Sequence, residues 1–198
     1  MNSATPLRPK IAPCAAACPA GIDVPRYVRQ ISAGRFSEAL ATIRERIPFP
    51  LACGYACFHP CEAKCARSQY EGPVAIRMLK RAAAELGSNA PLPAAPGKTG
   101  SKAAIIGSGP CGLTAAYYLA LLGHDVTVFE ALHRSGGMLR YGIPGYRLPD
   151  EIVDADIGVI ETSGVKIRTG RRVESAEALL DQGYHAVFIA SGAWRAAG

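Results

Sequence analysis

The chain has 198 residues, 49% of them hydrophobic, and a formal net charge of +6. This length suffices for one medium domain or two small ones. The basic residues are scattered rather than gathered in one run, which argues against a nucleic-acid-binding protein. The first ten residues lack the apolar core of a secretory signal, and no stretch approaches the ~20 apolar residues of a membrane span. We therefore expect a cytoplasmic protein, in which thiols stay reduced.

Three short helices are predicted in the first region, residues 1–88, because apolar residues recur there at helical spacing. Asp23 is a plausible N-cap of the first helix. Ser37 is expected to cap the second, which Pro48 and Pro50 would end, and Pro73 suits the first turn of the third. Three short helices bury little apolar surface for a region of this length, which favours additional stabilisation by an internal metal ion or cluster.

The stretch CGYACFHPCEAKC, residues 53–65, holds four cysteines, each four residues after the last. That interval would stack the sulfurs on one face of a helix, but Pro60 disfavours an unbroken helix because its ring clashes with the preceding turn. A turn-rich run that converges its side chains favours metal ligation over an apolar stripe. The odd total of seven cysteines fits complete disulfide pairing poorly. Structural zinc stays open as an alternative, although zinc more often uses C-x2-C or C-x4-C pairs.

A proline- and glycine-rich segment, residues 89–101, is predicted to be a linker. The second region, residues 102–198, alternates between strand and helix patterns. Strands are predicted at 102–107, 124–130, 165–169 and 185–190, and helices at 107–123, 150–164 and 174–182. This βαβ rhythm is typical of a parallel sheet covered by helices.

Gly107, Gly109 and Gly112 form a G-x-G-x-x-G motif directly after the first predicted strand of this region. In a Rossmann fold these glycines permit a tight turn, a close approach of backbone to a pyrophosphate, and packing of helix on strand. The helix N-terminus then offers free N–H groups to the phosphates. Glu130 ends the second strand, where an acidic side chain can accept hydrogen bonds from ribose hydroxyls. The motif predicts a dinucleotide site.

A second glycine pair, Gly136 and Gly137, follows the acidic strand. It resembles the flavoprotein version of this fold, in which such a pair lets the backbone approach the FAD pyrophosphate. The closing Ala-Ser-Gly at 190–192 resembles the A-T-G motif of the same flavoproteins. We expect FAD rather than NAD in this site, and NADP least of all, because Glu130 would repel a 2′-phosphate.

Several motifs, taken together and in order, resemble one family: the small subunit of glutamate synthase and the similar N-terminal half of dihydropyrimidine dehydrogenase. The resemblance runs from about Cys14 to the end of the chain. It is carried by CAAACPAGIDVPRYVRQI, IRERIPFPLACGYACFHPCEAKC, GPVAIRMLKR, GSGPCGL, VTVFE, GGMLRYGIPGYRLP and GYHAVFIASG. It implies an α-helical domain with two 4Fe–4S clusters, followed by a Rossmann-like FAD domain that an NADPH domain interrupts. Electrons would pass from NADPH to FAD and leave through the clusters toward a protein partner, such as a large catalytic subunit or a ferredoxin-like protein.

The resemblance also implies the iron ligands, which must be soft thiolates. One cluster in some members has a fourth ligand that is not a cysteine. The implied ligands are Cys18, Cys57 and Cys61 for that cluster, and Cys14 and Cys65 for the other. Cys53 falls on no usual ligand position, so it is expected either to be a small buried side chain or to replace a missing ligand. His59 is expected at the surface or in the core. Residues 1–13 lack the two further cysteines of the family, so one cluster and two both remain open.

On the flavin side the resemblance implies contacts around the pyrophosphate, the ribose and the adenine. The implied residues are Gly107, Ser108, Gly109, Pro110, Cys111 and Gly112 at the pyrophosphate, Glu130 at the ribose, Gly136, Gly137 and Met138 beside the diphosphate, Arg147 as a charged contact, and Val173 as backbone near the adenine. Cys111 is expected to be no more than a small side chain in the loop.

The chain ends at Gly198, and the family's NADPH half and C-terminal flavin segment do not follow. We expect a piece of a longer protein, or a split enzyme whose partner supplies the rest, with NAD(P)H acting only through that part. No catalytic acid, base or nucleophile is predicted, because the chemistry belongs to the cofactors. The favoured function is an electron-transfer module of an NAD(P)H-dependent oxidoreductase. A non-catalytic docking or relay subunit and a zinc-stapled adaptor are the alternatives.

Overall fold

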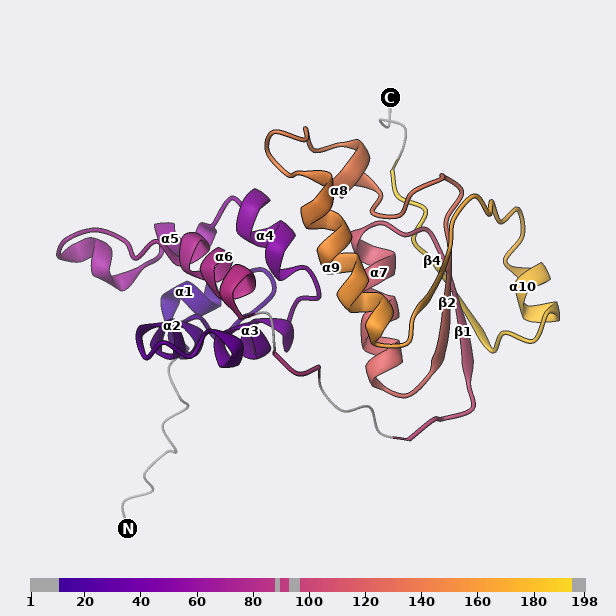
Figure 1. Ribbon diagram of the computed structural model, residues 1–198, viewed down its shortest axis with the longest axis horizontal. Coiled ribbons are helices and arrows are strands. Elements are labelled where there is room, and N and C mark those ends of the chain that lie inside the picture. Colours follow the sequence, from indigo (N-terminus) through magenta and orange to yellow (C-terminus); the bar gives the residue numbers. More distant parts are fainter. Residues whose placement is uncertain (1–10, 88–89, 93–96, 194–198) are drawn as a thin grey trace, which may run out of the picture.

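Figure 1 shows a helical part followed by an α/β part, in the order that the sequence predicts. The computed structural model describes residues 11–87, 90–92 and 97–193. The predicted domain boundary at residues 88 and 89, and the middle of the predicted linker, lie outside the described residues. The limits of the two domains therefore stay a prediction.

The helical part is built from short segments. They are α1 (Pro13–Ala16), α2 (Val24–Ser32), α3 (Phe36–Arg44), α4 (Pro50–Ala56), α5 (Pro60–Ala63), the 3-10 turn η1 (Ala66–Gln69) and α6 (Ile76–Leu86). α2 begins as predicted, because the side chain of Asp23 accepts a hydrogen bond from the Arg26 amide at 3.1 Å. This N-cap satisfies one of the free donors of the first turn.

Two predicted helix boundaries around α3 and α4 are wrong. Ser37 does not cap a helix: α3 begins at Phe36, and the Ala39 amide already donates to the Arg35 carbonyl at 3.1 Å. The first turn is therefore closed before Ser37 could cap it. Pro50 does not end a helix but opens α4, because proline fits the first helical turn, where no N–H donor is needed.

The third predicted helix starts at Ile76 rather than near Pro73. The Val74 amide donates to Cys65 Sγ at 3.5 Å, and the Ile76 amide donates to the Val74 carbonyl at 2.7 Å. These contacts form a tight turn that keeps Pro73 outside the helix. A cysteine nine residues away thus fixes where α6 begins.

The cysteine run is broken near Pro60, as predicted. α4 ends at Ala56, the chain turns at Cys57–His59, and Pro60 opens α5. His59 has φ +48°, a left-handed conformation that is uncommon for a residue with a side chain. The turn-rich interpretation misses α4, in which Cys53 lies.

One apolar cluster forms the core of the helical part. Tyr27 is 1% exposed, and its hydroxyl donates to the Ile76 carbonyl at 3.3 Å. Its buried neighbours in the cluster are Ile22, Val24, Ala39, Ile43, Cys61, Ile76 and Ala83. Cys14 and Cys18 pack against the same cluster, so these thiols lie at the edge of an apolar core.

The α/β part contains a four-stranded, all-parallel sheet in the order β3-β2-β1-β4. Its strands are β1 (Lys102–Ile106), β2 (Asp125–Phe129), β3 (Lys166–Arg168) and β4 (Ala186–Ile189). The helices are α7 (Pro110–Leu121), α8 (Met138–Tyr141), α9 (Asp150–Thr162) and α10 (Glu177–Asp181). α7 and α9 cover one face of the sheet and α10 lies toward the other (Figure 1). The predicted βαβ fold class is confirmed.

The helical and α/β parts share a core. α4 packs against α9, and Phe49 and Ala52 are buried in the same cluster as Leu113 and Tyr117 of α7. The Tyr118 hydroxyl donates across the boundary to the Glu45 carbonyl at 3.3 Å. The two parts are therefore packed on one another through apolar side chains rather than joined by the linker alone.

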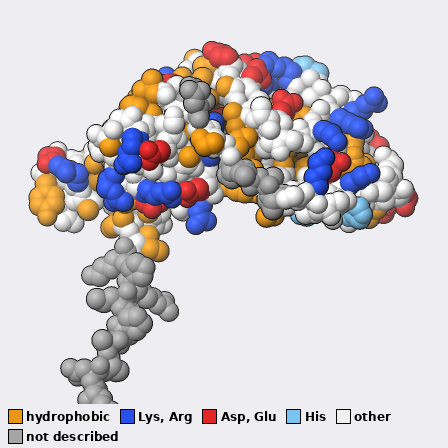
Figure 2. Space-filling view, turned by 60° about the horizontal axis from the view of Figure 1, so that its bottom comes forward, with side chains coloured by type: hydrophobic (Ala, Val, Ile, Leu, Met, Phe, Trp, Pro, Cys, Tyr) orange, Lys and Arg blue, Asp and Glu red, His pale blue; other side chains and the backbone are white. Residues whose placement is uncertain are grey.

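Basic and acidic side chains are interspersed on the face of the molecule in Figure 2, as the scattered charges of the sequence indicate. None of the helices in the described part of the chain combines the length and apolar character needed to cross a membrane.

Candidate functional site

The glycine motif lies in the turn between β1 and α7, with the geometry of a dinucleotide loop. Gly107 has φ +105°, and a Cβ at this position would lie 2.3 Å from the Ala190 carbonyl oxygen. A Cβ on Gly112 would lie 2.0 Å from the Gly107 carbonyl oxygen. Only glycine fits at either position, because the first site needs a left-handed backbone beside β4 and the second seats α7 against the loop.

The second glycine pair is in backbone contact with the first motif. Gly137 has φ +52°, and a Cβ on it would lie 2.6 Å from the Cα of Gly109. The Gly136 amide donates to the Ser108 carbonyl at 3.1 Å and to the Ser108 hydroxyl at 3.3 Å. Two glycine segments that the sequence places far apart thus form one backbone cradle, of the kind that a diphosphate requires.

The side chain of Glu130 is hydrogen-bonded to the first glycine loop. This side chain is 6% exposed, and one carboxylate oxygen accepts from both the amide and the hydroxyl of Ser108, the amide at 2.9 Å. The other oxygen accepts from the Leu132 amide at 2.9 Å. A carboxylate has about four acceptor sites, so three serve the protein's own chain and about one is left for a ribose hydroxyl. The predicted ribose contact stays a prediction.

A cavity of about 380 Å³ opens above the cradle. Nine of the twelve residues predicted for the flavin line it: Gly107, Ser108, Gly109, Pro110, Cys111, Glu130, Gly137, Met138 and Val173. Gly112 and Gly136 do not line the cavity. Arg147 is exposed in the segment after α8 and does not line the cavity.

Arg171 and Arg172 also line the cavity, and the sequence interpretation missed them. From the sequence alone they are two of the scattered basic residues. The signal that could have found them is their position just beyond β3, because ligands in parallel sheets bind outside the carboxyl ends of the strands. The Ala-Ser-Gly segment at 190–192 lines the same wall and follows β4 in the same way.

The thiols of the helical part are gathered by the packing of α1 against α5. Burial raises the pKa of the Cys61 thiol, and Cys18 and Cys57 are among the charged groups that act on it. Burial also raises the pKa of Cys14, whose neighbours include Cys65. This grouping matches the two ligand sets that the resemblance implies, which stay a prediction. Within the described residues, no three His, Cys, Asp or Glu side chains are close enough to hold a single metal ion.

Two sulfurs accept hydrogen bonds from backbone amides, one in each predicted ligand set. The His59 amide donates to Cys57 Sγ at 3.3 Å and the Val74 amide donates to Cys65 Sγ at 3.5 Å. Amide hydrogen bonds to ligating sulfurs tune cluster potentials. These thiols therefore suit iron–sulfur ligation. The His59 imidazole is half-exposed, and its Nδ1 lies 3.1 Å from the Glu62 carboxylate.

Cys53 differs from the other thiols of the run in its packing, although Cys57 and Cys18 also act on its thiol. It lies on α4 and packs against the core that α4 shares with the α/β part. Burial raises the pKa of its thiol. These surroundings favour the interpretation of Cys53 as a small buried side chain. Cys111, in contrast, is exposed in the first turn of α7.

Comparison with known families gives an assignment for each part. Residues 6–91 match the family model for dihydropyrimidine dehydrogenase domain II with its 4Fe–4S cluster, and residues 105–164 match the model for an NAD(P)-binding Rossmann-like domain. The chain joins a dihydropyrimidine dehydrogenase-type 4Fe–4S domain to a Rossmann-like domain. The predicted order of a 4Fe–4S domain and a Rossmann-like domain is confirmed, as is the dihydropyrimidine dehydrogenase side of the resemblance.

Named relatives extend across both domains. The chain is 44% identical to the NADPH-Fe(3+) oxidoreductase subunit beta of Geobacter sulfurreducens, over 93% of this chain and 28% of that protein. It is 43% identical to the NADP(+)-dependent formate dehydrogenase subunit beta of Moorella thermoacetica, over 91% and 29%. It is 37% identical to the NAD-dependent dihydropyrimidine dehydrogenase subunit PreT of Salmonella typhimurium, over 91% and 45%. The chain thus spans less than half the length of each of these relatives.

Proposed function

We propose that the chain is the electron-transfer module of an NAD(P)H-dependent oxidoreductase, with FAD in the Rossmann-like domain and at least one cluster in the 4Fe–4S domain. The observation that carries the proposal is the backbone contact between Gly109 and Gly137. It gives the cavity a second glycine segment beside the first, which suits a flavin nucleotide's diphosphate. The 4Fe–4S domain lies against this Rossmann-like domain through α4 and α9.

The choice between FAD and a nicotinamide dinucleotide depends on the wall of the cavity. Both ligands carry an adenosine diphosphate half, which is the part that the cradle would take. Glu130 argues against a 2′-phosphate, but Arg171 and Arg172 line the same cavity and could accommodate one. The prediction that NADP is the least suitable occupant therefore loses part of its support. The second glycine pair is what favours FAD.

When bound, FAD would exchange electron pairs with a nicotinamide and single electrons with a cluster. The chain's own part would be to hold the diphosphate on the two glycine segments and to hold iron on the thiols around Cys61. The amide donors at Cys57 and Cys65 would set part of the cluster's potential. A partner subunit, or a further part of a longer protein, would receive or supply the electrons, as the subunit names of the relatives suggest.

The test is a binding comparison on the chain purified without oxygen. Iron and acid-labile sulfide are measured first, and FAD, NADPH and NADH are then titrated separately by calorimetry. We expect iron with equivalent sulfide, and tighter binding of FAD than of either nicotinamide dinucleotide. Zinc without iron would instead support the adaptor, and NADPH binding tighter than FAD would reassign the cavity.

A further inference from the structure

Helix α9 is in contact with both cofactor-binding parts of the chain. It packs on α4 of the 4Fe–4S domain, and on α7 and α8 of the Rossmann-like domain. Asp154 and Asp156 are two positions apart on it. At 100° per residue their side chains leave the helix in widely different directions, so one helix can serve two neighbours.

Asp156 reaches the start of α4. It is 1% exposed, and its two carboxylate oxygens accept from the Ala52 amide at 2.8 Å and from the Leu51 amide at 3.3 Å. The N-cap residue of α4, Phe49, supplies no side-chain hydrogen bond. Free amides in a first helical turn need an acceptor, which the oxygens of the Asp156 carboxyl supply. A carboxyl group from another domain thus caps α4.

The helix that Asp156 caps leads directly to the candidate iron ligands. Cys53 lies on α4, and Cys57 follows its last residue, with the Cys57 amide donating to the Cys53 carbonyl at 3.3 Å. Any shift of the first turn of α4 along α9 would move Cys57 as well. Asp156 therefore fixes the position of one candidate ligand relative to the Rossmann-like domain.

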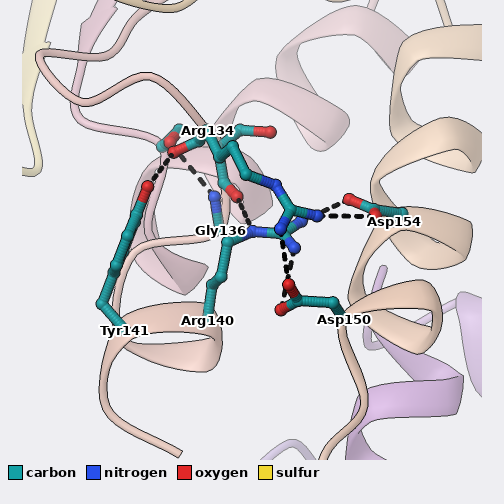
Figure 3. Close-up of polar contacts among 8 residues, drawn as sticks. Arg134, Gly136, Arg140, Tyr141, Asp150 and Asp154 are labelled. Atoms are coloured by element: carbon teal, nitrogen blue, oxygen red, sulfur yellow. Dashed lines mark hydrogen bonds and ion pairs between the residues drawn. The ribbon is translucent and has the colours of Figure 1, made fainter. Parts of the chain in front are cut away.

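Asp154 acts on the opposite side, at the second glycine segment (Figure 3). It pairs with Arg140, whose side chain is 4% exposed and whose Nε donates to the Ser135 carbonyl at 2.8 Å. Asp154 also accepts from Arg134 at 3.0 Å, and Asp150 at the start of α9 pairs with both arginines as well. A Cβ on Gly136 would lie 3.1 Å from the Val153 side chain of α9, so the turn is seated directly on this helix. The ion pairs hold that turn against α9.

We infer that Asp154 and Asp156 are positioning residues that tie the diphosphate-binding turn and the cluster-bearing helix to the same rigid element. The consequence is a fixed separation between the two cofactors, since neither site can move along α9 without breaking hydrogen bonds of the buried Asp156 or ion pairs of the half-exposed Asp154. Electron transfer slows as the gap between donor and acceptor widens, so this separation matters for the module. The identity of the cofactors rests on the proposed function, but the contacts do not.

Hydrogen exchange, followed by mass spectrometry on the full chain, tests the two ties separately. Asp156→Asn is expected to speed exchange in residues 50–56 at least tenfold and to leave residues 135–142 unchanged. The double variant Asp150→Asn, Asp154→Asn, which removes both carboxylates that pair with Arg134 and Arg140, should do the reverse. Glu161→Gln removes a charge from an exposed position of the same helix and should change neither segment. Unchanged exchange at 50–56 in Asp156→Asn, or equal acceleration of both segments by the double variant, would overturn the inference.

A second readout uses the chain loaded with FAD and iron. After photoreduction of the flavin, Asp156→Asn should slow the bleaching of the cluster at least tenfold, with unchanged iron content, FAD affinity and cluster potential. A wild-type rate would show that the cap does not set the separation. If the wild-type chain bound neither cofactor, the proposed function would fail, but the exchange result would still decide the ties. Should Asp156→Asn not fold, the double variant at the half-exposed Asp150 and Asp154 decides alone.

Discussion

Gly109 and Gly137, which belong to separate segments of the chain, approach so closely that a Cβ on Gly137 would lie 2.6 Å from the Gly109 Cα. A side chain on Gly137 would push the two segments apart, whereas a Cβ on Gly109 would lie 4.0 Å from the Gly137 Cα and would fit. The contact joins the turn after β1 to the turn before α8. The nucleotide cavity is therefore a product of two local structures held in register by the sheet and by α9.

Gly137→Ala is expected to weaken FAD binding strongly. Alanine at φ +52° costs on the order of 1–3 kcal/mol, and its Cβ must also displace the loop at Gly109. We expect a loss of affinity of roughly 10–100-fold, measured by calorimetry, with unchanged iron content. Gly145→Ala is the matched control, because nothing lies within 4 Å of an added Cβ there. Equal affinities in both variants would contradict the cradle.

Glu130→Ala is expected to loosen the glycine loop at residues 107–112. It removes the acceptor for Ser108 and Leu132 in a buried place, which costs about 1–3 kcal/mol for each donor left unsatisfied. Lower unfolding free energy and weaker FAD binding should appear together, while iron is retained. Glu174→Ala, at an exposed position paired with Arg172, should change the unfolding free energy by less than about 1 kcal/mol. Loss of iron in Glu130→Ala would argue against two separable sites.

The cysteines at 57 and 53 should respond differently to replacement by serine. Cys57 belongs to a predicted ligand set and accepts an amide hydrogen bond on its sulfur, so Cys57→Ser should lose the visible iron–sulfur absorbance. Cys53 packs in the shared core, so Cys53→Ser should keep the absorbance and lower stability by about 1–3 kcal/mol through a buried hydroxyl. Bleaching in Cys53→Ser would identify it as a substitute ligand instead.

The stability of the fold should depend on the ionisation of Asp156. Burial raises the pKa of its carboxyl from 3.8 to about 7, against the opposing effects of the Ala52 and Leu51 amides and of Arg44. A carboxyl whose pKa is raised in the folded state stabilises the fold fully below its unfolded pKa, and that contribution is lost as the pH rises through about 7.

Urea unfolding at pH 5 and pH 8 measures this effect. The wild-type chain should lose on the order of 1–4 kcal/mol between these values relative to Asp156→Asn, which cannot ionise there. Glu161→Gln should follow the wild type, because its position is exposed. Parallel pH curves for wild type and Asp156→Asn would show that the pKa is not raised.

Local features of the fold and site could be predicted from the sequence. The Asp23 cap, the break near Pro60 and the loop at 107–112 each depend on residues within a few positions of one another. The same holds for the strands, whose apolar runs match the observed sheet.

Contacts between distant segments could not be predicted in this way. Asp156 caps α4 from more than 100 positions away, and no local pattern distinguishes it from the other acidic residues of α9. The role of Pro50 is mispredicted because the same residue type can end one helix or open another. Arg171 and Arg172 become part of the cavity only once the strand order is known.

The burial of Phe49 and Ala52 among side chains of α7 has a consequence for how the molecule denatures. Cleavage of the linker would not give two independently stable domains, because each fragment would expose an apolar surface that the other fragment covers in the intact chain. Heating should accordingly melt both halves in a single cooperative transition.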